Sequence, residues 1–265
     1  MYSQPAGPRS IGGVIDDAAR LYRDSFRYIL PLLIANAILA AVPGLILGLN
    51  QAAAATPAEQ GRAVLHLITS PSFWIAFLVV LLANLLMYGA LIGSLDSVAR
   101  GGRMALGEAL QLGLSRLARV IGASFLFSLA VTAGIILFVI PGIYLMGIFQ
   151  LIFVAIILED SSVIGAFGIS RRLIKGHWWR SAMILTVAII ILVVLSLLGG
   201  VVAAILGALR FGAGTALIVN QLVGLIVNIF VVGWMPCVLL AMYYDLKLRH
   251  EGEDLATRVN ALAAR

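Results

Sequence analysis

Long runs without charged residues dominate the pattern of apolar and polar positions along the chain. Asp, Glu, Lys, Arg and His are absent from the following runs: 28–50, 73–95, 120–158, 181–209 and 211–244. A membrane-spanning helix needs about 20 apolar residues. The runs do not alternate as the strands of a membrane barrel do, and a helix satisfies its own backbone groups within hydrocarbon. The pattern therefore predicts an all-α integral membrane protein.

Six transmembrane helices fit these runs. We expect them at 28–49, 73–95, 120–140, 142–158, 181–209 and 213–244. The 120–158 run is too long for one span, and the turn dipeptide Pro141-Gly142 divides it. The whole chain, 1–265, is expected to form a single six-helix membrane domain with a flexible N-terminus over 1–9 and a cytoplasmic tail over 246–265.

Basic residues predict the orientation of these spans. The N-terminal segment, the 96–119 and 159–180 connections and the tail contain four Lys or Arg residues each, whereas the other connections contain only Arg62 and Arg210. Basic residues accumulate on the cytoplasmic side of a membrane, so both termini are predicted to be cytoplasmic. The net charge of +6 belongs to these segments, and we expect no nucleic-acid partner.

A threefold pattern runs along the chain. Three predicted hairpins each follow an amphipathic stretch, at about 11–27, 106–119 and 163–175. Each hairpin ends at an acidic residue: Asp96, then Glu159-Asp160, then Asp245. Amphipathic helices of this kind suit the headgroup layer. We expect three elbow-plus-hairpin units, each with an amphipathic cytoplasmic interfacial helix.

Motifs for catalysis or metal binding are missing from the sequence. Cys237 is the one cysteine, and His66, His177 and His250 lie in separate connections. No glycine-rich phosphate loop or paired metal-ligand spacing occurs. The predicted spans contain no ionisable residue of the kind that proton-coupled transporters and intramembrane proteases use. We expect no enzyme activity, no catalytic residue, no metal and no cofactor.

Basic and aromatic side chains cluster before the fifth predicted span. They are Arg171, Arg172, Lys175, His177, Trp178, Trp179 and Arg180. Cations beside Trp at the cytoplasmic surface suit anionic lipid headgroups. The same residues also suit orientation and anchoring alone. The sequence supports the two interpretations equally.

Neutral amides are the main polar groups within the predicted spans: Asn36, Asn84, Gln150, Asn220, Gln221 and Asn228. Gln221 and Asn228 are seven residues apart and share a helix face. The amides predict either a polar binding cleft or, as the favoured interpretation, hydrogen bonds between helices. Small residues at helix-packing spacing accompany them, including Gly89 with Gly93 and Gly199 with Ala203.

Several of these motifs resemble those of a known family. The matching stretches are Ile140-Pro141-Gly142-Ile143-Tyr144, Glu159-Asp160, 170–180, and Tyr243-Tyr244-Asp245-Leu246 with Arg249, Glu251-Gly252 and Asp254-Leu255. They resemble the membrane domain attached to some bacterial glycerophosphoryl diester phosphodiesterases, and the order of segments is similar to the YciC-type inner-membrane proteins. The resemblance covers most of the chain, from about Ile11 to Leu255. It implies a bacterial inner membrane and a link to lipids, but the phosphodiesterase barrel and its metal site have no counterpart here.

Three functions agree with these observations. The favoured one is a non-enzymatic inner-membrane protein that binds, senses or moves phospholipids or related amphiphiles. The alternatives are a membrane scaffold or subunit of a larger complex, and a solute facilitator. The expected partners are membrane lipids, above all anionic phospholipid, and either a second copy of the chain or another membrane protein.

Overall fold

The computed structural model describes residues 4–5, 7–52, 56–208 and 213–263. Within these ranges the chain forms helices and turns and no strand. The helices are α1 (Ile11–Ala52), α2 (Pro57–Thr69), α3 (Pro71–Ala99), α4 (Leu106–Leu137), α5 (Val139–Ile148), α6 (Ile152–Glu159), α7 (Val163–Ile174), α8 (Trp178–Ala208) and α9 (Ala213–Ala263). Helical segments of membrane-spanning length and hydropathy are Ile11–Pro43, Pro71–Ala99, Leu106–Leu137, Val139–Glu159, Trp178–Leu206 and Ile218–His250. The predicted all-α class is confirmed for the described residues, which include six helical segments long and apolar enough to span a membrane.

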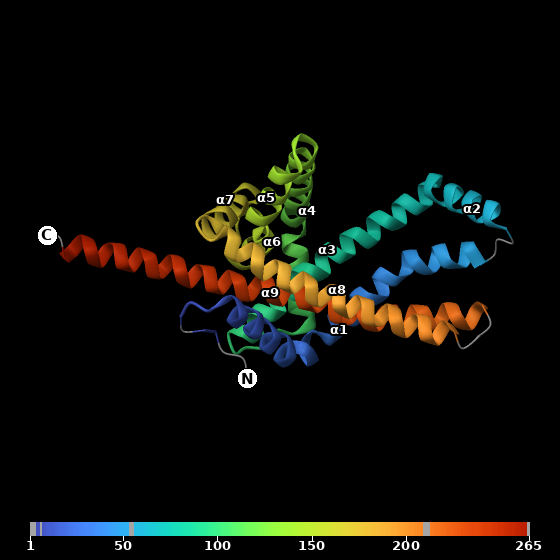
Figure 1. Ribbon diagram of the computed structural model, residues 1–265, viewed down its shortest axis with the longest axis horizontal. Coiled ribbons are helices and arrows are strands. Elements are labelled where there is room, and N and C mark those ends of the chain that lie inside the picture. The colour runs from blue at the N-terminus through green and yellow to red at the C-terminus, as the bar shows by residue number, and fades with distance from the viewer. Residues whose placement is uncertain (1–3, 6, 53–55, 209–212, 264–265) are drawn as a thin grey trace.

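The three helix pairs α1–α3, α4–α5 and α8–α9 diverge from a common region (Figure 1). We call this region the base; it comprises residues 11–37, 89–123, 148–180 and 233–250. The opposite ends of the three pairs are called the tips. Large side chains such as Ile92, Ile152 and Leu240 are fully buried in the base. At the tips Ile136 and Ile140 are 79% and 80% exposed. The tightly packed core therefore lies at one end of the spans.

Three successive residues of α9 join the other helices at the base. The Tyr244 hydroxyl donates a hydrogen bond to Asp96 at the end of α3, and the Tyr243 hydroxyl donates to Glu159 at the end of α6. The Asp245 carboxylate is 1% exposed and accepts from Arg180 of α8 at 2.8 Å and from Arg249 at 3.0 Å. The acidic residues that end the predicted hairpins are thus brought together around α9.

The N-terminal segment is also tied to the base. The backbone amide of Arg9 donates to Asp245 at 2.7 Å, and the Arg9 carbonyl accepts from Arg180 and Arg249, at 2.6 Å each. The predicted flexible N-terminus includes residues 1–3 and 6, which lie outside the described residues. At the other end, α9 continues through the predicted tail and projects away from the helix pairs (Figure 1).

The first two stretches predicted as amphipathic interfacial helices are continuous with helices long and apolar enough to span a membrane. The stretch at 11–27 begins α1, and the stretch at 106–119 begins α4. The third stretch forms the separate helix α7, which ends before Gly176. Gly176 has φ +87°, a left-handed conformation that glycine adopts without steric cost. The 11–27 stretch, by contrast, joins the apolar run that begins at Tyr28 without a helix-terminating residue between them, so α1 continues through the junction.

The turn between α4 and α5 lies at Phe138, three residues before the predicted Pro141-Gly142 turn. Phe138 is extended, with φ −161° and ψ 140°. Pro141 instead occupies the first turn of α5, where its missing N–H leaves no intrahelical hydrogen bond unmade. Gly142 allows the close approach of the two helices, because a Cβ there would lie 2.8 Å from the Ile135 nitrogen.

The span predicted at 142–158 is interrupted near its middle. Helix α5 ends at Ile148 and α6 begins at Ile152. The buried Ser170 of α7 bridges this break, since its hydroxyl donates to the Ile148 carbonyl at 2.7 Å and accepts from the Leu151 amide at 3.2 Å. Irregular backbone at membrane depth persists where protein groups satisfy it. Helix α7 therefore supports the broken span.

Candidate functional site

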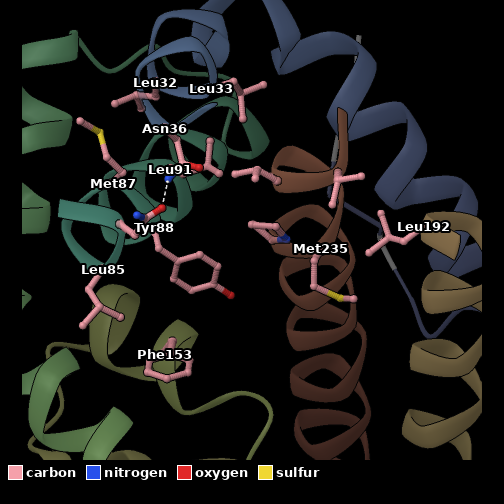
Figure 2. A pocket seen from close by; sticks show the side chains of 14 residues that line it. Leu32, Leu33, Asn36, Leu85, Met87, Tyr88, Leu91, Phe153, Leu192 and Met235 are labelled. Atoms are coloured by element: carbon pink, nitrogen blue, oxygen red, sulfur yellow. Dashed lines mark hydrogen bonds between the residues drawn. The ribbon is translucent and has the colours of Figure 1, made fainter. Parts of the chain in front are cut away.

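An apolar, partly open cavity of about 490 Å³ lies at the edge of the base and is lined by residues of α1, α3, α6, α8 and α9 (Figure 2). Its walls include Leu32, Leu85, Leu91, Phe153, Leu192 and Met235. The polar side chains in the lining are Asn36, Asn84 and Tyr88. Ligand sites typically occupy about 300–1,000 Å³ and have mostly apolar linings with few polar groups. The cavity has the size and chemistry of a site for an apolar ligand.

Asn36 and Asn84, two of the predicted intramembrane amides, meet at one wall of this cavity. The Asn36 amide nitrogen donates to the Asn84 side-chain oxygen at 2.9 Å, as Figure 2 shows. The Asn84 nitrogen donates in turn to the Val80 carbonyl at 2.8 Å. The pair joins α1 to α3, in agreement with the favoured interpretation that the amides form hydrogen bonds between helices. It also places polar atoms beside the cavity.

Tyr88 projects from α3 into the cavity (Figure 2). Its ring packs edge-to-face on Phe153, with the centroids 5.9 Å apart and an interplanar angle of 83°. Its hydroxyl has no hydrogen-bond partner among the described residues, so it can bind a polar group of a ligand. Tyr88 was not predicted as a site residue, because its one signal in the sequence is that it is a lone tyrosine within an apolar run.

The predicted basic cluster is divided between the surface and the interior. Arg171, Arg172, Lys175 and Trp179 are exposed, and Trp179 is exposed to 76%. Trp178 is half-buried and donates from its indole nitrogen to the Tyr144 carbonyl at 3.2 Å. The exposed members remain available to lipid headgroups, whereas Trp178 fastens α8 to α5.

His177 and Arg180 of the same cluster face other helices. The His177 ring lies 6.1 Å from the His250 ring, centroid to centroid, so two histidines from separate predicted connections come together. Arg180 pairs with the buried Asp245. Across the part of the chain that the structure describes, no group of three or more His, Cys, Asp or Glu residues could hold a metal ion.

The remaining predicted amides lie in two other places. Gln150 occupies the break between α5 and α6, with its nitrogen 3.8 Å from the Met242 sulfur. Asn220 and Asn228 line a notch of about 320 Å³ between α8 and α9, together with Gly224. Gln221 is half-buried and is not among the residues that line the notch. The polar face of α9 at this notch thus combines Asn228 with Asn220 rather than with Gln221.

Comparison with known proteins gives no further guide to these sites. No protein-family model, curated protein or solved structure matches the chain. The resemblance to the membrane domain of glycerophosphoryl diester phosphodiesterases and to YciC-type proteins stays a prediction from the sequence.

Proposed function

We propose that this chain is a non-enzymatic bacterial inner-membrane protein that binds phospholipids or related amphiphiles, with an acyl chain in the cavity between α1, α3 and α9. The observation that carries the proposal is the cavity itself, with its volume of about 490 Å³ and its apolar lining. Binding of this kind is the step that sensing or moving a lipid would require.

An acyl chain is the occupant that the lining favours. An apolar void loses dispersion contacts on its walls, and water gains little there because it finds few hydrogen-bond partners. Lipid tails are the apolar groups present at high concentration around the spans. The polar atoms of Asn36, Asn84 and Tyr88 lie beside the cavity and can contact a glycerol or ester group.

The proposal places the base at the cytoplasmic surface. Arg100, Arg180 and Arg249 all lie at the base, together with both exposed arginines of the predicted basic cluster. Lys and Arg favour the cytoplasmic side of a membrane. In this orientation the amphipathic beginnings of α1 and α4, and helix α7, lie near the headgroup layer as three related elbows.

Filling the cavity tests the proposal. Leu85→Trp adds a large side chain to the cavity wall, whereas Val79→Trp makes a comparable change on the exposed face of α3, where Val79 is 59% exposed. Phospholipid that stays bound after release from nanodiscs is counted by native mass spectrometry. We expect Leu85→Trp to lose retained lipid and Val79→Trp to keep it.

The opposite pattern would contradict the proposal. Retention that is unchanged in Leu85→Trp, while the variant unfolds at the wild-type temperature, would show that lipid does not occupy the cavity. Equal loss in both variants would show that retained lipid covers the exposed helix faces instead.

A further inference from the structure

A basic groove of about 430 Å³ lies at the base, between α1 and the connection that follows α3. Its charged side chains are Arg23, Asp24, Arg27 and Arg103. Three guanidinium groups face one carboxylate, and that carboxylate lies 3.3 Å from Arg23. The groove therefore carries a net positive charge.

Two arginines from distant parts of the chain converge on one aromatic ring in this groove. The guanidinium carbon of Arg27 lies 4.6 Å from the centroid of the Tyr28 ring, and that of Arg103 lies 5.2 Å from the same centroid. Arg27 also donates to the Tyr28 hydroxyl. The ring holds both cations in place through cation–π attraction but does not neutralise them.

Several other arginines of the base are compensated by carboxylates, whereas Arg171 and Arg172 are exposed at the surface. Arg100 pairs with Asp96, and Arg180 pairs with Asp245. Arg116 and Arg119 both pair with Asp160. Arg27 and Arg103 have no carboxylate partner within the described ranges. Two like charges held close together repel each other, and a bound anion relieves that repulsion.

The shape of the guanidinium group indicates which class of anion the groove would bind. Its planar fork donates two parallel hydrogen bonds, which match the oxygens of a phosphate. Phe26 and Val98 also line the groove and supply apolar contact beside the charges. A phosphate attached to an apolar body fits this combination better than a small, fully hydrated anion does.

The groove and the apolar cavity lie one after the other along the same two helices, α1 and α3, as the headgroup and acyl chain of one phospholipid would require. Helix α1 contributes Tyr28 to the groove and Leu32 to the cavity, about 6 Å further along the helix. Helix α3 contributes Val98 to the groove and Leu91 to the cavity, about 10 Å apart along its axis. A headgroup and its acyl chain span distances of this order.

We propose that Arg27, Arg103 and Tyr28 bind the phosphate of an anionic phospholipid whose acyl chain occupies the cavity. This inference rests on the proposed function and adds the headgroup site and the charge of the ligand. It assigns headgroup selection to this groove rather than to the exposed cluster at Arg171, Arg172 and Lys175.

Two short lipids that differ in the phosphate test the assignment. Dioctanoyl phosphatidylglycerol and dioctanoylglycerol are titrated into the full-length protein in detergent, and bound lipid is measured by native mass spectrometry. The groove variant is Arg27→Gln with Arg103→Gln, and the matched control is Arg171→Gln with Arg172→Gln. We expect the groove variant to bind phosphatidylglycerol about tenfold or more weakly and dioctanoylglycerol as before, because charge-assisted hydrogen bonds are lost. The control variant keeps both affinities.

Further arms identify the source of the phosphate and the geometry of the site. Inorganic phosphate is expected not to displace phosphatidylglycerol; full displacement would assign the groove to free phosphate and overturn the lipid site. Arg27→Lys with Arg103→Lys keeps the charge without the fork, and we expect an affinity between those of wild type and the Gln variant.

The outcomes separate this inference from the proposed function. Binding of neither lipid to the wild type would contradict the proposed function itself. Binding of both lipids, with phosphatidylglycerol unaffected in the groove variant or equally weakened in the control variant, would overturn the headgroup assignment alone. Unchanged dioctanoylglycerol binding in the groove variant shows that its fold is intact.

Discussion

The base and the tips are parts of the same long apolar helices, yet the base is much more tightly packed than the tips. On α3, Ile92 is fully buried in the base, whereas Ile75 near the tip is 65% exposed. In a bilayer, lipid tails are as apolar as leucine, so hydrophobicity gives helices little reason to associate. The difference between the two regions therefore depends largely on polar groups that link the helices, and these concentrate at the base.

The polar groups of the base lie where the three helix pairs meet. Tyr243, Tyr244 and Asp245 connect α9 to α6, α3 and α8. Small residues allow the backbones to approach, as at Gly89 and Gly113 where α3 crosses α4. The described parts of the tips contain no ion pair between helices, and their close approaches, such as Gly134 with Gly142, join the two helices of one pair. Lipid is expected to fill the space between the pairs.

Removing the Asp245 carboxylate is expected to have the largest effect on this contrast. Asp245→Ala leaves the guanidinium groups of Arg180 and Arg249 partly buried without their anion. Loss of one partner of a buried ion pair costs about 3–5 kcal/mol. Denaturant unfolding in detergent micelles measures the loss in the free energy of unfolding.

A surface ion pair and a tip residue are the controls for this measurement. Asp16→Ala breaks a pair with Arg20 in which both side chains are more than half exposed, and such pairs contribute at most about 1 kcal/mol. Ile136→Ala at a tip is expected to change stability by less than about 0.5 kcal/mol. Losses as large as that of Asp245→Ala in either control would contradict the contrast between base and tips.

A smaller effect is expected where α3 and α4 cross. A Cβ at Gly113 would lie 2.5 Å from the Leu86 carbonyl oxygen, which is backbone and cannot rotate away. Gly113→Ala should therefore cost about 1–3 kcal/mol in unfolding free energy. Gly107→Ala, in the same helix and in open space, should change stability by less than about 0.5 kcal/mol. Equal stability of the two variants would show that the close approach of α3 and α4 does not require a glycine at position 113.

The spans could be predicted from the sequence because the absence of charge over more than 20 residues leaves few structural alternatives. The interruption at 149–151 could not be predicted, since Phe149, Gln150 and Leu151 lie in an uncharged run with no glycine or proline among them, and the compensating Ser170 lies in another helix. Helix α2 was also missed. Its beginning, Thr56-Pro57 followed by Glu59, is a capping box that the sequence displays.

The candidate site was harder to predict from the sequence than the fold. The basic cluster at 171–180 is prominent because its members are neighbours in sequence, but Arg180 serves the buried Asp245. Arg27 and Arg103 are separated by most of two spans, and only the folded chain brings them to one ring. A site assembled from distant helices leaves no local sequence pattern. In addition, the sequence does not show whether an arginine has a carboxylate partner.

Photolabelling by a phospholipid with a diazirine near the end of one acyl chain tests most directly whether lipid occupies the cavity between base and tips. The full-length protein is labelled in vesicles, and labelled peptides are mapped by mass spectrometry. The account predicts saturable labelling at 85–91 and 231–236, suppressed by unlabelled phospholipid, and unsaturable labelling at the α3 tip, 74–81. Labelling of the cavity segments that is no stronger than that of the tip, and unaffected by competitor, would contradict it.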